Sequence, residues 1–369
     1  MLVDGKNYEG IWLDEIDPSV VKVINQQKLP FNFEISELRS VEDAWSAIRE
    51  MIVRGAPLIG VTGAYGMYLA TLEINAYTNI PDHLSNAARY LISSRPTAVN
   101  LPLSVNYVLK RLLENINSKN LPQTALTAAR ETAEKEKSLC REIGIHGLTL
   151  IEKISMEKNG GPVNILTHCN AGWLACVDYG TALAPVYFAH DRGIPVHVWV
   201  DETRPLNQGA RLTSWELGKK GVPYTLIPDN TGGYLMQKGM VDIVIVGSDR
   251  TTAKGDVINK IGTYLKALAA HDNKIPFYAA VPSTSIDILT TDAFSQVKIE
   301  ERSPEEVIMV TGISGDKIHK VRICPEDTVA ANWGFDITPA KFVTGIITEK
   351  GIIRANSKDI KNLFSDKSE

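Results

Sequence analysis

Residues 163–200 read VNILTHCNAGWLACVDYGTALAPVYFAHDRGIPVHVWV. The two ends of this stretch, 163–166 and 196–200, are short apolar runs rich in β-branched residues, and they predict strands. Residues 182–190 between them have the apolar spacing of a helix. A strand, a helix and a second strand in this order predict a βαβ unit with parallel strands.

The same alternation continues toward the C-terminus. The further elements expected are, in chain order, a helix at 209–219, a strand at 224–227, a short helix at 234–238, a strand at 243–246, a helix at 261–271 and a strand at 277–281. The strands are continuously apolar, which is typical of a parallel sheet covered by helices on both faces. The sequence therefore predicts an α/β fold with a Rossmann-like, doubly wound parallel sheet in its C-terminal part.

The N-terminal part has a different pattern. Apolar residues three and four positions apart predict helices at 41–51, 87–92, 101–116 and 126–143. The polar, glycine-rich segment EKNGGP at 157–162 is the expected boundary between the two parts. We therefore expect a mainly helical N-terminal domain, residues 1–158, and a Rossmann-like catalytic domain, residues 159–369.

Composition and charge exclude several classes of protein. The chain of 369 residues is 44% hydrophobic and 22% charged, as in soluble globular proteins, and its net charge of −4 gives no general reason to bind nucleic acid or an anionic membrane. The uncharged stretch 56–72 has spaced glycines and charged neighbours, so we interpret it as a buried helix, not a membrane span. The N-terminus lacks a secretory pattern, and the four cysteines form no CxxC pair, so we expect reduced thiols and a cytoplasmic location.

The carboxyl ends of the predicted strands carry the candidate chemistry, because ligands bind beyond these ends in open parallel sheets. Cys169, in THCNAG, follows the first strand and is expected to enter a helix, whose first amides favour a thiolate or an anion. The alternative is an inert buried thiol. Asp249, in VGSDR, follows another strand and is a candidate for a desolvated general acid. A salt bridge to Arg250 or a helix cap would explain it equally well.

Other motifs carry weaker signals. The stretch NKIGTYLKALAA at 259–270 predicts a helix that opens with Asn, Lys and Gly, which is either a phosphate site or an ordinary capped helix. Arg54 and Arg95 lie beside turn-forming residues, as phosphate-binding and ordinary surface arginines both do. His168 precedes Cys169, but neighbours on a strand point to opposite faces, which disfavours a Cys–His dyad. The sequence has no GxGxxG, Walker or HExxH motif, so no nucleotide or metal site is expected.

Several longer stretches together resemble the methylthioribose-1-phosphate isomerase family. They are VRGAPLIGVTGAYG (53–66), SRPTAVNLPLSVN (94–106), ILTHCNAGWLA (165–175), VWVDETRPLNQGARLTSWEL (198–217), IPDNTGGYLM (227–236), VGSDRTTAKGDVINKIGTYLKALAA (246–270) and NWGFDITPAKFVTGIITEKGII (332–353). The resemblance implies a helical domain followed by a Rossmann-like domain, and a homodimer. It also implies an aldose–ketose isomerase of methionine salvage that converts 5-methylthioribose 1-phosphate to 5-methylthioribulose 1-phosphate without a metal or other cofactor.

The resemblance also implies roles for single residues. Cys169 matches the catalytic cysteine of the family, and Asp249 matches its catalytic acid. The substrate-binding positions, which largely hold the phosphate, match Arg54, Gly55, Ala56, Arg95, Gln208, Asn259 and Lys260. Related proteins supply the alternatives: a 5-deoxyribose-1-phosphate isomerase, a ribose-1,5-bisphosphate isomerase, or a non-catalytic regulatory subunit of the translation-initiation exchange factor. The joint presence of Cys169 and Asp249 disfavours a purely regulatory role.

Overall fold

The computed structural model describes residues 1–95, 99–118 and 120–365. The chain forms two compact units, here called unit 1 (Met1–Arg141 with Gly172–Gly180) and unit 2 (Glu142–Ala171 with Thr181–Glu369). The division falls inside the long helix α5 (Leu121–Glu157). The boundary expected at residue 158 lies just beyond the end of that helix.

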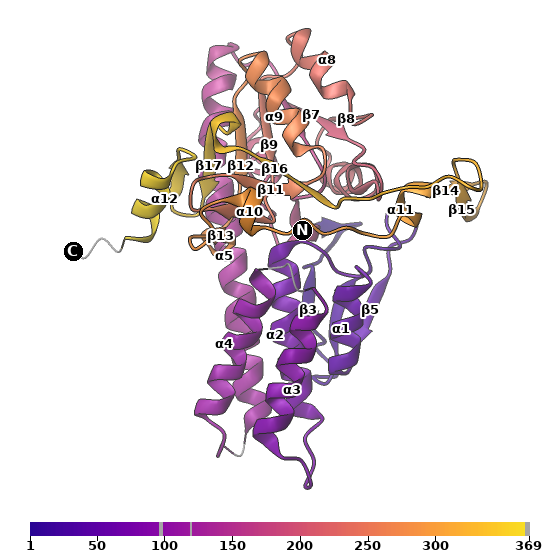
Figure 1. Ribbon diagram of the computed structural model, residues 1–369, viewed down its shortest axis with the longest axis vertical. Helices are drawn as coiled ribbons and strands as arrows, with labels where there is room; N and C mark the ends of the chain where they lie inside the picture. Colours follow the sequence, from indigo (N-terminus) through magenta and orange to yellow (C-terminus); the bar gives the residue numbers. More distant parts are fainter. Residues whose placement is uncertain (96–98, 119, 366–369) are drawn as a thin grey trace. The chain divides into compact units, whose positions relative to one another are not determined.

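Helices make up most of unit 1, as the apolar spacing predicts. The helices before α5 are α1 (Val41–Arg49), α2 (Ala56–Leu72), α3 (Ile80–Ser93) and α4 (Asn100–Glu114). Helix α2 is buried from Ala56 to Thr71 and contacts α1, α3 and α4 (Figure 1). A Cβ added at Gly63 would lie within 2.8 Å of side chains of α4, so glycine lets the two helices approach closely. In the described residues, no helix is long and apolar enough to cross a membrane.

Unit 1 also contains short antiparallel strands that the sequence did not predict. They are β1 (Leu2–Val3), β2 (Lys6–Asn7), β3 (Ile11–Leu13), β4 (Val21–Ile24) and β5 (Ile35–Leu38). Strands β3, β4 and β5 form one sheet in this order, and β1 pairs with β2. Each strand is two to four residues long, which is too short for an alternating apolar pattern to stand out.

A seven-stranded sheet forms the centre of unit 2 (Figure 1). Its strands are β6 (Val163–Thr167), β7 (Val196–Asp201), β8 (Tyr224–Ile227), β9 (Ile243–Val246), β12 (Phe277–Ala280), β17 (Gly345–Thr348) and β18 (Gly351–Ile353). The order across the sheet is β18-β17-β12-β9-β6-β7-β8, and β18 alone in this sheet pairs antiparallel. Numbered along the chain, the parallel strands have the 3-2-1-4-5-6 order of a Rossmann fold, which confirms the predicted fold class.

Helices connect the parallel strands of this sheet. They are α6 (Ala184–Asp191), α7 (Ser214–Lys220), α8 (Thr231–Gln237) and α9 (Thr263–Asp272). Strands β6 and β9 are neighbours, with Ile165 opposite Ile243 and Leu166 opposite Val244. From β6 the chain continues outward to β7 on one side, and from β9 it continues to β12 on the other. The topological switch point, where Rossmann folds bind ligands, therefore lies between the carboxyl ends of β6 and β9.

A second, smaller sheet of unit 2 follows β9 along the chain. It contains β13 (Ile286–Asp287), β10 (Arg250–Thr252), β11 (Val257–Lys260) and β16 (Phe335–Thr338), in this order. The remaining elements are α10 (Ala293–Gln296), α11 (Glu305–Ile308), the hairpin of β14 (Met309–Ser314) and β15 (Lys317–Arg322), and α12 (Ser357–Phe364). Asn259 and Lys260 thus end a strand, and the prediction that they open a helix was wrong. Helix α9 begins at Thr263, after the turn at Gly262.

Candidate active site

Cys169 lies two residues beyond the end of β6 in an unusual backbone conformation. Its φ angle is +65°, in the left-handed region that costs a non-glycine residue about 1–2 kcal/mol. Two threonine hydroxyls hold this backbone in place. The Cys169 amide donates to Thr203 Oγ1 at 2.8 Å, and the Cys169 carbonyl accepts from Thr213 Oγ1 at 2.6 Å. Strained residues of this kind cluster at functional sites.

The expected helix start at Cys169 is absent from this part of the described chain. Trp173–Ala175 form a single 3₁₀ turn, η1, and α6 begins only at Ala184. The amides of an α-helix start therefore do not stabilise a thiolate at Cys169, and this part of the prediction was wrong. The Cys169 side chain is buried but retains 8% exposure.

Asp249 lies between β9 and β10 and is half-buried. Its backbone amide donates to the carbonyl of Ile258 in β11 at 3.0 Å. A Cβ added at Gly247 would lie 2.8 Å from the Cβ of Ala171, so the segment after β9 touches the segment after β6. Gly247 is two residues before Asp249, and Ala171 is two residues after Cys169. The two predicted catalytic residues thus occupy adjoining segments at the switch point.

Three predicted substrate-binding residues also belong to unit 2. Gln208 is buried, directly before the π-helical turn η2 (Gly209–Thr213), and its Oε1 atom has no hydrogen-bond partner in the described structure. Asn259 donates from Nδ2 to Thr263 Oγ1 at 3.0 Å. Lys260 places its ammonium 4.7 Å from the ring centroid of Phe335 on β16. A buried amide oxygen without a partner and a lysine in a largely buried setting are features of a polar ligand site.

The other predicted substrate-binding residues belong to unit 1. Gly55 has a φ of +96°, and a Cβ there would lie 2.3 Å from the carbonyl oxygen of Ala175, so only glycine fits. Ala56 is the first residue of α2, where no side chain caps the helix, and such backbone amides bind anions well. Arg54 precedes this turn. Arg95 follows α3, and the Pro-Thr pair after it lies outside the described residues.

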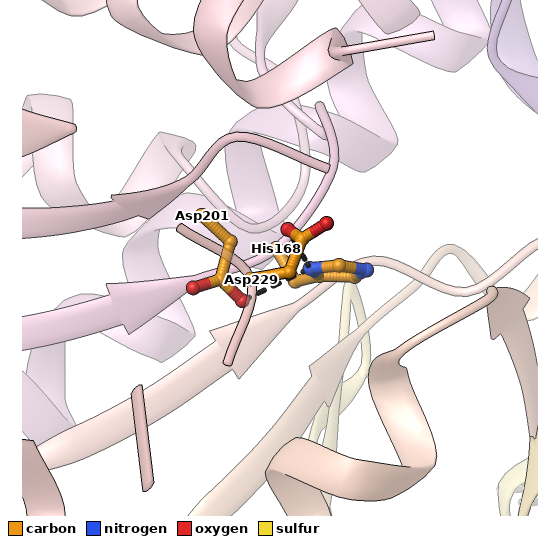
Figure 2. A group of neighbouring side chains, drawn as sticks. All are labelled: His168, Asp201 and Asp229. Atoms are coloured by element: carbon orange, nitrogen blue, oxygen red, sulfur yellow. Dashed lines mark hydrogen bonds and ion pairs between the residues drawn. The ribbon is translucent and has the colours of Figure 1, made fainter. Parts of the chain in front are cut away.

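A cluster of titratable side chains lies at the carboxyl edge of the sheet. His168 Nδ1 is 3.0 Å from Asp201 Oδ2 and 4.0 Å from Asp229 Oδ1 (Figure 2). These residues follow or end β6, β7 and β8, which confirms that the strand ends converge. Lys266 of α9 places its ammonium 2.9 Å from Asp201 Oδ2. The acids could hold a metal ion, but the lysine ammonium already supplies a positive charge in contact with Asp201.

The ring of His168 is fully engaged within this cluster. Its Nδ1 meets Asp201, and its Nε2 is 2.8 Å from the carbonyl oxygen of Ile261. Both ring nitrogens therefore already have partners other than Cys169. The opposite-face argument does not apply, because β6 ends at Thr167 and neither residue lies on the strand. Lys266 was not among the predicted site residues, although a lysine inside the apolar run YLKALAA is a usable signal, because such a lysine needs a buried partner.

The local environment raises the pKa of two nearby acids. Burial raises the pKa of Asp336 on β16, although the amides of Gly262 and Tyr264 donate to its carboxylate and partly oppose the shift. Burial also raises the pKa of Glu202, and the nearby Asp229 adds to this shift. These two carboxyl groups therefore release their protons at a higher pH than exposed carboxyl groups do.

Comparison with known proteins gives the same picture along the whole chain. A model of the Initiation factor 2 subunit family matches residues 52–355. A protein of Desulfatibacillum aliphaticivorans, named methylthioribose-1-phosphate isomerase, is 53% identical over 367 residues, which cover 100% of both chains.

Two solved structures are also similar. That of 5-methylthioribose 1-phosphate isomerase from Pyrococcus horikoshii OT3 is 37% identical with a TM-score of 0.84, covering 97% of this chain and 96% of the other. That of translation initiation factor eIF-2B, subunit delta, from A. fulgidus is 40% identical with a TM-score of 0.79, covering 96% of this chain and 100% of the other.

Proposed function

Because this chain belongs to the Initiation factor 2 subunit family, and within it to the methylthioribose-1-phosphate isomerases, we propose that it converts 5-methylthioribose 1-phosphate to 5-methylthioribulose 1-phosphate. This is an intramolecular oxidoreduction in methionine salvage. The observation that carries the proposal is the placement of Cys169 and Asp249 on adjoining segments at the switch point of a Rossmann-like sheet.

The chemistry must begin with a closed sugar ring, because the phosphate on C1 prevents spontaneous opening. In the proposal, Asp249 donates a proton to the ring oxygen, and the bond between that oxygen and C1 breaks. A hydrogen then moves from C2 to C1, and the C2 hydroxyl loses its proton as the ketone forms. Cys169 assists this transfer by carrying a proton between the two carbons, or by accepting the hydroxyl proton while a hydride shifts directly. The released proton balances the one given by Asp249.

The phosphate needs donors that do not take part in proton transfer. Lys260 and Asn259 in unit 2 are proposed for this role. Gln208 is proposed to accept a hydrogen bond from a sugar hydroxyl, because its buried Oε1 atom has no partner in the described structure. Arg54, Gly55, Ala56 and Arg95 of unit 1 are proposed as further phosphate contacts on the basis of the family resemblance. No step in this scheme calls for a metal ion or a nucleotide.

The decisive experiment is a parallel turnover assay of the purified protein. The substrates are 5-methylthioribose 1-phosphate, 5-deoxyribose 1-phosphate and ribose 1,5-bisphosphate, and Cys169→Ser and Asp249→Asn are the test variants. We expect turnover of the first substrate, and a collapse of kcat in both variants with little change in thermal stability. Near-normal turnover by either folded variant would remove that residue from the mechanism.

The same assay in D₂O separates the two transfer routes. A proton that passes through Cys169 can exchange with solvent, so deuterium would appear at C1 of the product. A direct hydride shift would leave C1 free of deuterium.

The similarity to the A. fulgidus structure of translation initiation factor eIF-2B, subunit delta, supports a second candidate function, that of a translation-initiation regulatory subunit. Failure of the folded protein to turn over any of the three substrates would favour this candidate. Efficient turnover of the bisphosphate alone would instead indicate a ribose-1,5-bisphosphate isomerase.

We propose a homodimer in the cytoplasm as the working form. The family resemblance supports the dimer, and the four free cysteines fit a reducing compartment. Light scattering coupled to size-exclusion chromatography measures the mass directly, and a monomer at micromolar concentration would contradict the dimer.

A further inference from the structure

The buried His168 side chain joins two parts of unit 2 that carry candidate site residues. The residue directly precedes Cys169, and its Nε2 atom bonds to the carbonyl of Ile261, which directly follows Lys260. From this geometry we infer that His168 is a positioning residue. It holds the turn at 259–262 against the end of β6 and so fixes Lys260 relative to Cys169. The inference rests on the proposed function, in which both residues act on one substrate.

Each ring nitrogen of His168 has one oxygen partner in this arrangement. Nδ1 lies 3.0 Å from a carboxylate oxygen of Asp201, and Nε2 lies 2.8 Å from the Ile261 carbonyl oxygen. The two partners lie on different segments, so the ring links the end of β7 to the turn after β11. His168 is only 1% exposed, so bulk water does not substitute for either partner.

The turn also packs directly against the ring. Gly262 has a φ of +104°, and a Cβ there would lie 3.0 Å from both Cε1 and Nε2 of His168. On the other side, the Gly262 amide donates to Asp336 of β16 at 2.7 Å. The turn is thus held from two directions, by Asp336 toward the small sheet and by His168 toward the end of β6.

The charged groups around His168, which are Asp201, Asp229 and Lys266, belong to one network. Lys266 bonds to Asp201 and also donates to the backbone carbonyl of Asp229. The Asp229 carboxylate in turn accepts the amides of Thr203 and Arg204, both at 2.7 Å. Thr203 is the residue whose hydroxyl holds the Cys169 amide. The network therefore reaches Cys169 from two sides, and His168 is the member that extends it to the Lys260 turn.

Two substitutions separate the two hydrogen bonds of the ring. Asparagine places an amide nitrogen near the position of Nδ1, so His168→Asn retains a donor for Asp201 and loses the bond to Ile261. Glutamine places its nitrogen near Nε2, so His168→Gln retains the bond to Ile261. His197, which is on β7 and bonds to Thr225 Oγ1 at 2.9 Å, provides the matched control His197→Gln.

We expect His168→Asn to raise KM for 5-methylthioribose 1-phosphate about tenfold, the cost of one lost hydrogen bond, with a smaller change in kcat. His168→Gln should stay within about threefold of the wild type in KM. Hydrogen–deuterium exchange in 259–263 should accelerate in His168→Asn, but not in His168→Gln or His197→Gln.

Other outcomes would overturn the inference. An unchanged KM in His168→Asn would overturn it. Equal losses of activity and of melting temperature in His168→Asn and His168→Gln would also overturn it, because they would indicate that the ring has a purely structural role. If the wild type itself turned over no substrate, the proposed function would fail, and the exchange measurement would still decide the positioning role.

Discussion

Replacing Cys169 with glycine should abolish turnover without the loss of stability that glycine usually causes. The reason is the φ angle of +65°, which is costly for every residue except glycine. The comparison that isolates this effect is Cys169→Gly against Cys169→Ala, because both variants lack the thiol. The reference pair is Ala279→Gly against the wild type, since Ala279 is buried in an ordinary strand of the same unit.

The magnitudes follow from three contributions to the free energy of unfolding. Removing a buried methyl group costs about 0.8 kcal/mol, and the greater freedom of unfolded glycine costs about 0.5–1 kcal/mol. At Ala279 both losses apply, so the variant should be about 1.5 kcal/mol less stable than the wild type. At Cys169 the relief of left-handed strain returns about 1–2 kcal/mol. The glycine and alanine variants at Cys169 should therefore differ by less than about 1 kcal/mol.

Urea unfolding followed by circular dichroism measures these differences, and the turnover assay shows that both Cys169 variants are inactive. Suppose that the two alanine-to-glycine changes lower the free energy of unfolding equally, that is, from Cys169→Ala to Cys169→Gly and from the wild type to Ala279→Gly. The left-handed backbone would then carry no strain, and the reasoning would be refuted.

The remaining predictions concern phosphate binding and pH dependence. Lys260→Ala should raise KM more than it lowers kcat in initial-rate measurements, whereas the exposed Lys254→Ala should leave both unchanged. Burial raises the pKa of Tyr65 to about 12, so the folded protein keeps a proton that the unfolded chain releases, and stability should fall between pH 10 and 12. Urea unfolding across that range should show a smaller fall in Tyr65→Phe. Burial also raises the pKa of Asp336, so unfolding releases its proton and stability decreases as pH rises from about 4. Asp336→Asn should lack this pH dependence. In urea unfolding, the free energy of unfolding of Asp336→Asn relative to that of the wild type should therefore increase from pH 4 to 7.

The sequence best predicted the bounds of strands that are buried on both faces. Runs such as IVIV at 243–246 are apolar throughout because both faces of the parallel sheet are covered, and the predicted strand bounds matched β9. The rim residues followed from these strands, since the carboxyl ends of parallel strands share one edge. Cys169 and Asp249 were therefore placed on that edge before any geometry was available.

Features that depend on distant contacts escaped prediction. Asn259 and Lys260 precede a strongly helical stretch, and only their pairing with Asp336 and Phe335 of β16 makes them part of a strand. The left-handed backbone at Cys169 is equally invisible in the sequence, because threonine hydroxyls from other segments hold it. In both cases tertiary hydrogen bonds outweigh local propensity.

The candidate residues of unit 2 also limit where substrate preference can arise. In the proposed scheme, Cys169 and Asp249 act at C1, C2 and the ring oxygen, while Lys260 binds the phosphate on C1. All of these groups are identical in 5-methylthioribose 1-phosphate and 5-deoxyribose 1-phosphate, so none of the three residues distinguishes the two sugars. The methylthio group differs from hydrogen only in apolar contact, a difference worth about 1–3 kcal/mol for a methylene-sized change. Variants at these three residues should therefore lose both activities in the same ratio, and a change in the ratio would show that one of them also contacts the 5-substituent.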